Sequence, residues 1–356
     1  MANQFDSLSC PGSADYNRFM LRCNLVGLSA CQVCITNPPP TFSHPLPYPL
    51  SRMSHDPDQQ ETPTNIDNPE YFTPIWCSLP WTPWVPFNAD KEEFRTIPKE
   101  PGLYRIRPTG KDFLMYIGET KRQLHQRLHE LRHTLQRGEL MPWNVPMTEA
   151  PSLWAWQDAE GFSYECSAAP LDASPGGRRG MQRYLLYRYR QERGESTLCN
   201  FGRFHPRYRK STNRKENQRG GKLEENHLDN PAGGPSGKPL PPIGTPGDRY
   251  WMGLPWIGRL PLDGESVSMV PSGAGLYLLF ERDSHDLVYI GQSADCAQRL
   301  RSHAMKLLDE KDMLVSYHIE KKPLLPHNLR ERENDLIGNY FEMYRKAPRY
   351  QFGNHR

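Results

Sequence analysis

The sequence has no long apolar run. Its longest such run, Ala274–Phe280, is interrupted by Gly275 and is much shorter than the ~20 residues that a membrane-spanning helix needs. The formal net charge of +3 is small and does not by itself indicate a polyanionic partner. The composition therefore predicts no membrane span, and a nucleic-acid partner has to be argued from where the charges lie.

The start of the chain has no pattern typical of a signal peptide. The segment Leu28–Cys31 has the form of a lipoprotein processing box and follows a weakly apolar stretch. That stretch contains Arg22 and Asn24 and lies far from the first residue, which argues against secretion. We therefore expect a cytoplasmic protein.

Cysteine pairs suited to a structural metal are also scarce. Cys31 and Cys34 have the spacing of a zinc knuckle, but a second pair is missing, because Cys10 and Cys23 are too far apart. His44 lies nearby in a proline run. Free thiols in a flexible tail are favoured over a zinc site, and the scattered remaining cysteines are typical of a reducing compartment.

Two stretches rich in proline, glycine and polar residues divide the chain. Residues 1–70 predict a disordered tail, and residues 205–245, with little apolar periodicity, predict a linker. The 35 prolines and the mean hydropathy of -0.77 agree with a large share of loop. Residues 71–204 and 246–356 are left as two folded domains of ordinary size.

The two domains repeat the same series of short motifs at the same spacing. In each, Leu-Pro-Trp precedes Gly-Leu-Tyr, and Tyr-Ile-Gly follows, its Tyr twelve residues after the Tyr of Gly-Leu-Tyr. The paired motifs are Leu79–Trp81 and Leu254–Trp256, Gly102–Tyr104 and Gly275–Tyr277, and Tyr116–Gly118 and Tyr289–Gly291. Gln182 and Glu333 also correspond, because each lies nineteen residues before a Phe-Gly pair. A series this long indicates a duplicated domain.

Local patterns predict the fold of each copy. The Gly-Leu-Tyr and Tyr-Ile-Gly runs are β-prone and separated by polar turn residues, which indicates an antiparallel hairpin. Leucines at helical spacing follow each Tyr-Ile-Gly, and Gln182 and Glu333 lie in later amphipathic stretches. We expect an α/β (α+β) fold in which each copy is a small antiparallel sheet flanked by helices.

This order of motifs resembles the GIY-YIG nuclease superfamily over both repeat units, about three-quarters of the chain. The family pattern is a Gly-φ-Tyr strand, a Tyr-Ile-Gly strand, a helix bearing Arg and a later helix bearing Glu. The resemblance implies a metal-dependent nuclease in which the first Tyr is the base for the attacking water. Such a tyrosine needs nearby cations to act at neutral pH.

The second copy carries the fuller set of candidate catalytic residues. Phosphodiester hydrolysis needs an activated water, stabilisation of charge on the phosphate and help for the leaving oxygen. Tyr277 and Tyr289 lie on paired strands, Arg299 offers a guanidinium suited to phosphate, and His303 lies one helical turn later on the same face. Glu333 is the candidate ligand for Mg²⁺ or Mn²⁺.

The first copy departs from this pattern. Tyr104, Tyr116 and Arg127 occupy the equivalent positions, but Leu131 stands where the histidine should be. Gln182 replaces the carboxylate and is a poor ligand for Mg²⁺. Asn200 matches the family's terminal asparagine, where the second copy has Gln351, so each copy has lost one polar position. We therefore expect catalysis in the second copy and treat the first as degenerate or as a second site.

The predicted linker contributes basic residues. Its candidate nucleic-acid-binding side chains are Arg203, Arg207, Arg209, Lys210, Arg214, Lys215, Arg219 and Lys222. A flexible basic segment beside a nuclease fold is suited to phosphate contact, and the alternative is a solvated linker. Structural alternatives also exist in the second copy: hairpin tyrosines can be packing pairs, and Glu333 can be a solvated helix charge.

The hypothesis drawn from these residues is a Mg²⁺- or Mn²⁺-dependent DNA endonuclease, with RNA as substrate left open. The second copy cuts, and the first assists DNA binding or target discrimination. A restriction or phage-defence role is a common use of the fold. Two rivals stay open: a non-catalytic nucleic-acid-binding protein with decayed sites, and an enzyme in which each copy cuts one strand.

Overall fold

The computed structural model describes residues 69–144, 147–307 and 312–353. Nearly all of the predicted tail, including Cys31 and Cys34, lies outside the described residues, so the tail and zinc hypotheses stay predictions. Within the described ranges, no helix combines the length and apolar character that crossing a membrane requires.

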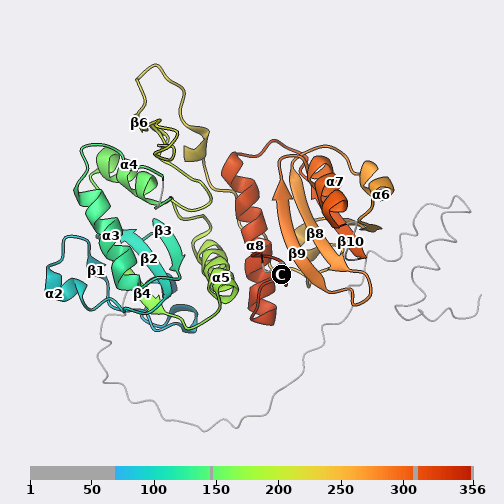
Figure 1. Ribbon diagram of the computed structural model, residues 1–356, viewed down its shortest axis with the longest axis horizontal. Coiled ribbons are helices and arrows are strands. Elements are labelled where there is room, and N and C mark those ends of the chain that lie inside the picture. The colour runs from blue at the N-terminus through green and yellow to red at the C-terminus, as the bar shows by residue number, and fades with distance from the viewer. Residues whose placement is uncertain (1–68, 145–146, 308–311, 354–356) are drawn as a thin grey trace, which may run out of the picture. The chain divides into compact units, whose positions relative to one another are not determined.

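The fold is mixed α/β and contains two four-stranded antiparallel sheets (Figure 1). The first has the order β1-β4-β2-β3, with β1 (Val85–Pro86), β2 (Gly102–Pro108), β3 (Tyr116–Thr120) and β4 (Tyr164–Pro170). The second has the order β7-β10-β8-β9, with β7 (Ile257–Pro261), β8 (Gly275–Glu281), β9 (Leu287–Ser293) and β10 (Met313–Ile319). The two orders are the same, strand for strand. In both sheets the Tyr-Ile-Gly strand, β3 or β9, is an edge strand.

Helices follow the strands in a matching order. The longer ones are α3 (Leu124–Gln136), α4 (Ala150–Glu160), α5 (Pro175–Arg193), α7 (Cys296–Leu307) and α8 (Pro326–Tyr344). The short ones are α2 (Lys91–Phe94), α6 (Gly264–Ser268) and the 3₁₀ turns η2 (Glu70–Phe72), η3 (Trp76–Ser78), η4 (Pro231–Gly233) and η5 (Trp251–Gly253). The helices expected after Tyr-Ile-Gly and around Gln182 and Glu333 are α3, α7, α5 and α8. α4 has no counterpart among the described residues of the second copy.

Both faces of the second sheet are covered, which explains why residues 275–280 of the inner strand β8 are all buried. Leu276 and Leu278 of β8 belong to the core cluster that contains residues of α8. Tyr277 and Leu279, which point the opposite way because strand side chains alternate, pack with residues of α7. The two helices that carry the candidate catalytic residues therefore lie on opposite faces of this sheet.

The two copies pack against each other mainly through α5 and α8, at positions where glycine allows close approach. A Cβ at Gly338 of α8 would lie 2.1 Å from Cβ of Tyr187 on α5. A Cβ at Gly180 of α5 would lie 2.8 Å from the ring of Phe341 on α8. A larger residue at either position would force these helices apart.

A fully buried ion cluster lies in the same interface. Arg190 of α5 donates to both carboxylate oxygens of Asp335 on α8, at 2.8 and 3.1 Å. Glu331, also on α8, accepts from the Ser236 hydroxyl at 3.1 Å and from the Gly237 amide at 2.8 Å. Residues of the segment between the copies thus satisfy charges that would be costly to bury alone.

The segment 205–245 differs from the flexible linker that its composition predicts. It forms the short hairpin of β5 (Tyr208–Arg209) and β6 (Gly221–Lys222), followed by η4. Tyr208 is buried in the core of the first copy, and Leu240 is buried in a core cluster with residues of the second. Aromatic and aliphatic anchors widely spaced along the chain hold this segment in place, and short windows of sequence do not reveal them.

Candidate active site

The paired tyrosines of the second copy occupy one side of the β8–β9 hairpin. Tyr277 pairs with Gly291 across the strands, and a Cβ at Gly291 would lie only 2.3 Å from the ring of Tyr277. The glycine of Tyr-Ile-Gly is therefore required, because the Tyr277 ring crosses it. The rings of Tyr277 and Tyr289 stack with centroids 6.0 Å apart.

Helix α7 brings a guanidinium and an imidazole to this pair. The Tyr277 hydroxyl lies 3.0 Å from Nε2 of His303, within hydrogen-bond distance. Nε of Arg299 donates to the same hydroxyl at 3.4 Å. The two helix residues are four apart, so both reach one side of α7. The structure thus brings Tyr277, Tyr289, Arg299 and His303 together as the sequence predicts.

Burial holds the Tyr277 hydroxyl in its neutral form. Desolvation raises its pKa, the neighbouring Tyr289 adds to this, and the hydrogen bond from Arg299 opposes it. In return, the hydrogen bond with Tyr277 raises the pKa of Arg299. Tyr277 therefore needs a partner that takes its proton, and His303 is placed to do so.

Glu333 comes from α8, on the other face of the sheet, and reaches the group only at its edge. Burial raises the pKa of Glu333, whereas Arg183, Arg330, the Gln292 backbone amide and then Arg299 lower it. Gln292 lies on the edge strand β9, so the carboxylate is close to the tyrosine strand. The side chain is half-buried rather than a solvated helix charge. Within the described ranges, no hydrogen bond or ion pair joins it to Tyr277, Tyr289 or His303.

The first copy repeats the tyrosine–arginine geometry but adds a carboxylate. Nε of Arg127 donates to the Tyr104 hydroxyl at 3.4 Å, the distance found in the second copy, and the rings of Tyr104 and Tyr116 lie 5.9 Å apart. The Tyr104 hydroxyl donates to Oε1 of Glu149 at 3.0 Å, and Nη2 of Arg127 donates to the same oxygen at 2.5 Å. Glu149 takes the place of the histidine.

Glu149 is a member of this side-chain group that the sequence does not predict. It is 1% exposed and precedes α4 directly. The only signal is a length difference: α3 ends at Gln136 and β4 begins at Tyr164, whereas α7 and β10 follow each other closely. That difference indicates an insertion without showing which of its residues reaches the tyrosine.

The amides of the first copy bind backbone. Nε2 of Gln182 donates to the Ile117 carbonyl at 2.9 Å, and Asn200 both accepts from the Ile117 amide and donates to its carbonyl. Gln351 makes the same two bonds to Ile290 in the second copy. The expected loss of this polar position in the second copy is therefore wrong, because the longer amide preserves the interaction.

Sequence comparison does not name these sites. No model of a known protein family matches the chain, and no curated protein matches it in sequence. The assignment of chemistry consequently depends on the geometry described above.

The eight basic residues predicted to bind nucleic acid fall into three groups. Arg203 is buried and donates to the carbonyls of Ser196, Thr197 and Gly234, so it holds the fold and is wrongly predicted as a phosphate contact. Arg207 and Lys210 are half-buried. The exposed members are Arg209, Arg214, Lys215, Arg219 and Lys222.

Glu333 is the single candidate carboxylate ligand for a divalent cation in the described part of this site. Among residues that the structure describes, no three His, Cys, Asp or Glu side chains are grouped to hold a metal ion. Mg²⁺ usually keeps several waters and uses one or two carboxylates together with substrate phosphates. The half-buried Glu333 is such a carboxylate, so Mg²⁺ or Mn²⁺ stays a prediction compatible with this site.

Proposed function

We propose that the second copy is the catalytic domain of a divalent-metal-dependent DNA endonuclease of GIY-YIG type, and that the first copy is a duplicated, non-catalytic domain. The observation that carries this proposal is the contact of the Tyr277 hydroxyl with both His303 and Arg299. A hydroxyl, a proton acceptor and a phosphate-binding cation at one point are what phosphodiester hydrolysis needs.

The proposed reaction uses the residues of the second copy in distinct roles. The oxygen of a water attacks phosphorus while its proton passes to the Tyr277 oxygen, and the proton of Tyr277 passes to Nε2 of His303. The P–O bond to the leaving oxygen breaks, and solvent protonates that oxygen. Arg299 stabilises charge on the non-bridging oxygens. Glu333 would hold the cation, which supplies Lewis-acid stabilisation when bound.

The difference in exposure supports this division between the copies. Arg299 is exposed, and Tyr289 and His303 are half-buried, so a phosphate can approach the second site. In the first site, Arg127 is engaged by the buried Glu149 at 2.5 Å, which leaves its guanidinium unavailable for phosphate. The exposed basic residues of 205–245 support a nucleic-acid partner for the chain. A restriction role is compatible with this activity.

The test is a titration of Mg²⁺ and Mn²⁺ against supercoiled plasmid with the full chain and two variants, Tyr277→Phe and Glu333→Ala. We expect cleavage that both substitutions abolish. Tight binding without cleavage of any DNA or RNA, under any metal, would instead support the non-catalytic reader. Loss of double-strand breaks with retained nicking in Tyr104→Phe would support one strand cut by each copy.

A further inference from the structure

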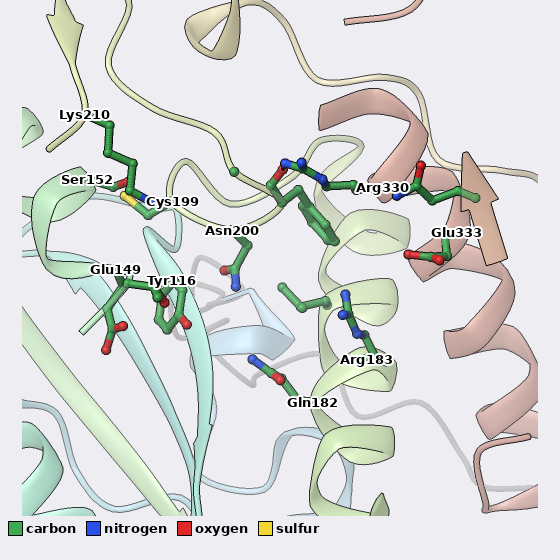
Figure 2. Close-up of a pocket in the computed structure, with 15 residues that line it drawn as sticks. Tyr116, Glu149, Ser152, Gln182, Arg183, Cys199, Asn200, Lys210, Arg330 and Glu333 are labelled. Atoms are coloured by element: carbon green, nitrogen blue, oxygen red, sulfur yellow. Dashed lines mark hydrogen bonds between the residues drawn. The ribbon is translucent and has the colours of Figure 1, made fainter. Parts of the chain in front are cut away.

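A pocket of about 420 Å³ opens where the two copies meet; its lining includes Tyr116, Gln182 and Asn200 of the first candidate site but not Tyr277. Figure 2 shows Tyr116 and Glu149 on one side of it, Arg330 and Glu333 on the other, and Gln182 between them. The volume lies in the range of small-molecule sites, roughly 300–1,000 Å³. The pocket is large enough for a ligand and is built from both copies.

The cations of this pocket lack the carboxylate partners that neighbouring arginines have. On α5 and α8, the arginines with a carboxylate oxygen within 4.0 Å are Arg178, Arg179, Arg188, Arg190, Arg193 and Arg332. Arg183 and Arg330 form no such ion pair with any described residue, and both line the pocket. Lys210, which lines it too, also has none in the described ranges. Arg183 and Arg330 lie on the Glu333 side of the pocket and Lys210 lies on the Glu149 side (Figure 2), so the lining carries three cations without a direct ion pair to the part of the chain that the structure describes.

The polar contacts of these cations are few. Nη1 of Arg183 lies 3.5 Å from Oδ1 of Asn334, at the limit of a hydrogen bond, and Nη1 of Arg330 donates to the Phe201 carbonyl at 3.0 Å. Desolvation lowers the pKa of Arg183 and of Lys210. Partly buried charges without partners destabilise a fold, and an anionic ligand would remove that cost.

The carboxylates of the pocket do not cancel this charge. Glu149 already accepts hydrogen bonds from Tyr104 and Arg127 through Oε1. Its Oε2 is buried and has no hydrogen-bond partner among the described residues, so it can accept from a ligand hydroxyl or amino group. Glu333 faces Arg183 and Arg330, so one carboxylate stands against two cations on that side of the pocket. The pocket therefore combines an excess of phosphate-binding groups with one unused acceptor.

We infer that this pocket binds a nucleoside monophosphate unit, with its phosphate at Arg183 and Arg330 and with hydroxyl or amino groups of its nucleoside at Lys210 and Oε2 of Glu149 on the opposite side (Figure 2). Arginine suits a phosphate, which offers several acceptor oxygens, and a lysine can donate to oxygens of a ribose or base. The unit is either a free nucleotide or the phosphorylated end of a strand. The inference goes beyond the proposed cleavage, because binding here requires no chemistry at Tyr277.

The test is a titration of the full chain by calorimetry in EDTA, without metal, so that no cleavage occurs. The probes are inorganic phosphate, a nucleoside 5′-monophosphate, and one oligonucleotide with and without a 5′-phosphate. We expect the monophosphate to bind more tightly than inorganic phosphate. A preference for the free monophosphate identifies a nucleotide site, and a preference for the 5′-phosphorylated oligonucleotide identifies a strand end.

Variants separate this site from general electrostatics. Arg183→Gln and Lys210→Gln should each weaken binding of the best probe by about 10- to 100-fold, since each removes a charged hydrogen bond. Arg179→Gln is the matched control, because this arginine lies on the same helix and pairs with Glu119 at 3.7 Å; it should change affinity less than about threefold. Thermal unfolding of each variant shows that the fold is retained, and Lys210→Gln serves if Arg183→Gln does not fold.

The variant Glu333→Gln distinguishes this inference from the proposed function. It should abolish cleavage while leaving the affinity for the monophosphate unchanged or higher, because it removes a negative charge from the pocket. Equal affinity of wild type, Arg183→Gln and Lys210→Gln would overturn the inference, as would the absence of binding by every probe at millimolar concentration. Equal affinity for inorganic phosphate and the monophosphate would overturn the nucleotide assignment.

Discussion

In both copies the arginine Nε lies 3.4 Å from the hydroxyl of a buried tyrosine. The copies differ in the third side chain that contacts this hydroxyl. In the second copy it is His303 on the same helix as the arginine. In the first it is Glu149, which directly precedes the additional helix α4. The Glu149 carboxylate forms an ion pair with Arg127. Both copies keep the tyrosine–arginine contact, and they differ in whether a buried carboxylate pairs with the arginine.

The largest expected effect comes from removing the equivalent hydroxyl in each copy. Tyr277→Phe should reduce the rate of plasmid cleavage by about 10²–10⁴-fold, the typical contribution of a general acid–base group. Tyr104→Phe should leave that rate within about threefold of wild type, because the arginine beside Tyr104 is already paired with Glu149. Single-turnover cleavage measures both. Equal losses in the two variants would show that the copies are equivalent.

The next largest expected effect is on the free energy of unfolding, where replacing Glu149 and replacing His303 should differ. Glu149→Ala should lower the free energy of unfolding by about 3–5 kcal/mol, because it leaves the largely buried Arg127 without its carboxylate. His303→Ala should cost less, about 0.5–1.5 kcal/mol, because it removes hydrogen bonding and ring contacts of a half-buried side chain but leaves no buried charge without its partner. Urea unfolding followed by circular dichroism measures both values. A cost for His303→Ala as large as that for Glu149→Ala would contradict the comparison.

Gln182 of the first copy and Glu333 of the second occupy equivalent positions. Replacing each by the residue type of the other should change stability in opposite directions. Gln182→Glu replaces the amide that donates to the Ile117 carbonyl by a second acceptor, which should cost about 1–3 kcal/mol at neutral pH. The folded-state pKa of the new carboxyl would be raised. Its cost is therefore present at neutral pH and disappears as the pH falls through that pKa towards the unfolded value.

Glu333→Gln is the reciprocal change. Burial raises the pKa of Glu333, so the wild-type carboxylate destabilises the fold above its unfolded pKa and ceases to do so in acid. The variant should be more stable than wild type at neutral pH and equal to it in acid. Thermal unfolding from pH 4 to pH 8 checks the sign, and a variant less stable at neutral pH would refute it.

The smallest expected effect is at the terminal amides. Gln351→Asn should cost about 0.5–1.5 kcal/mol, because the shorter side chain cannot keep both bonds to Ile290. Asn200→Gln should cost a similar amount, since Asn200 spans the same two groups of Ile117. Chemical denaturation of the two variants gives the comparison, and a much larger cost in one would show that the amides are not equivalent.

The hairpins and their flanking helices could be predicted from sequence because their signals are local. The glycine opposite Tyr277 indicates the hairpin, and the leucines at helical spacing indicate α3. Each of these signals involves residues close together in the chain. The grouping of Tyr277, Arg299 and His303 follows from those elements. Glu333 reaches the group only through packing of α8 on the opposite face, and the sequence does not show how closely it approaches.

The parts that the sequence did not indicate depend on contacts between distant residues. Glu149 meets Tyr104 across 45 positions. Arg190 meets Asp335 across 145 positions. The order in 205–245 depends on anchors such as Tyr208 and Leu240, which lie in different cores. Local polarity in that segment predicted a linker because these partners are not visible within it.

The α5–α8 interface also limits which halves can associate. Arg190 and Phe341 stand at equivalent positions, each eight residues after Gln182 or Glu333, and Gly180 and Glu331 are equivalent as well. If two α5 helices packed together in this way, Arg190 would face Gly180 instead of Glu331. If two α8 helices did, Phe341 would face the Glu331 carboxylate instead of Gly180. Association of two identical halves through this interface is therefore disfavoured. The pairing of unlike helices within one polypeptide gives Arg190 its acidic partners and Phe341 its glycine.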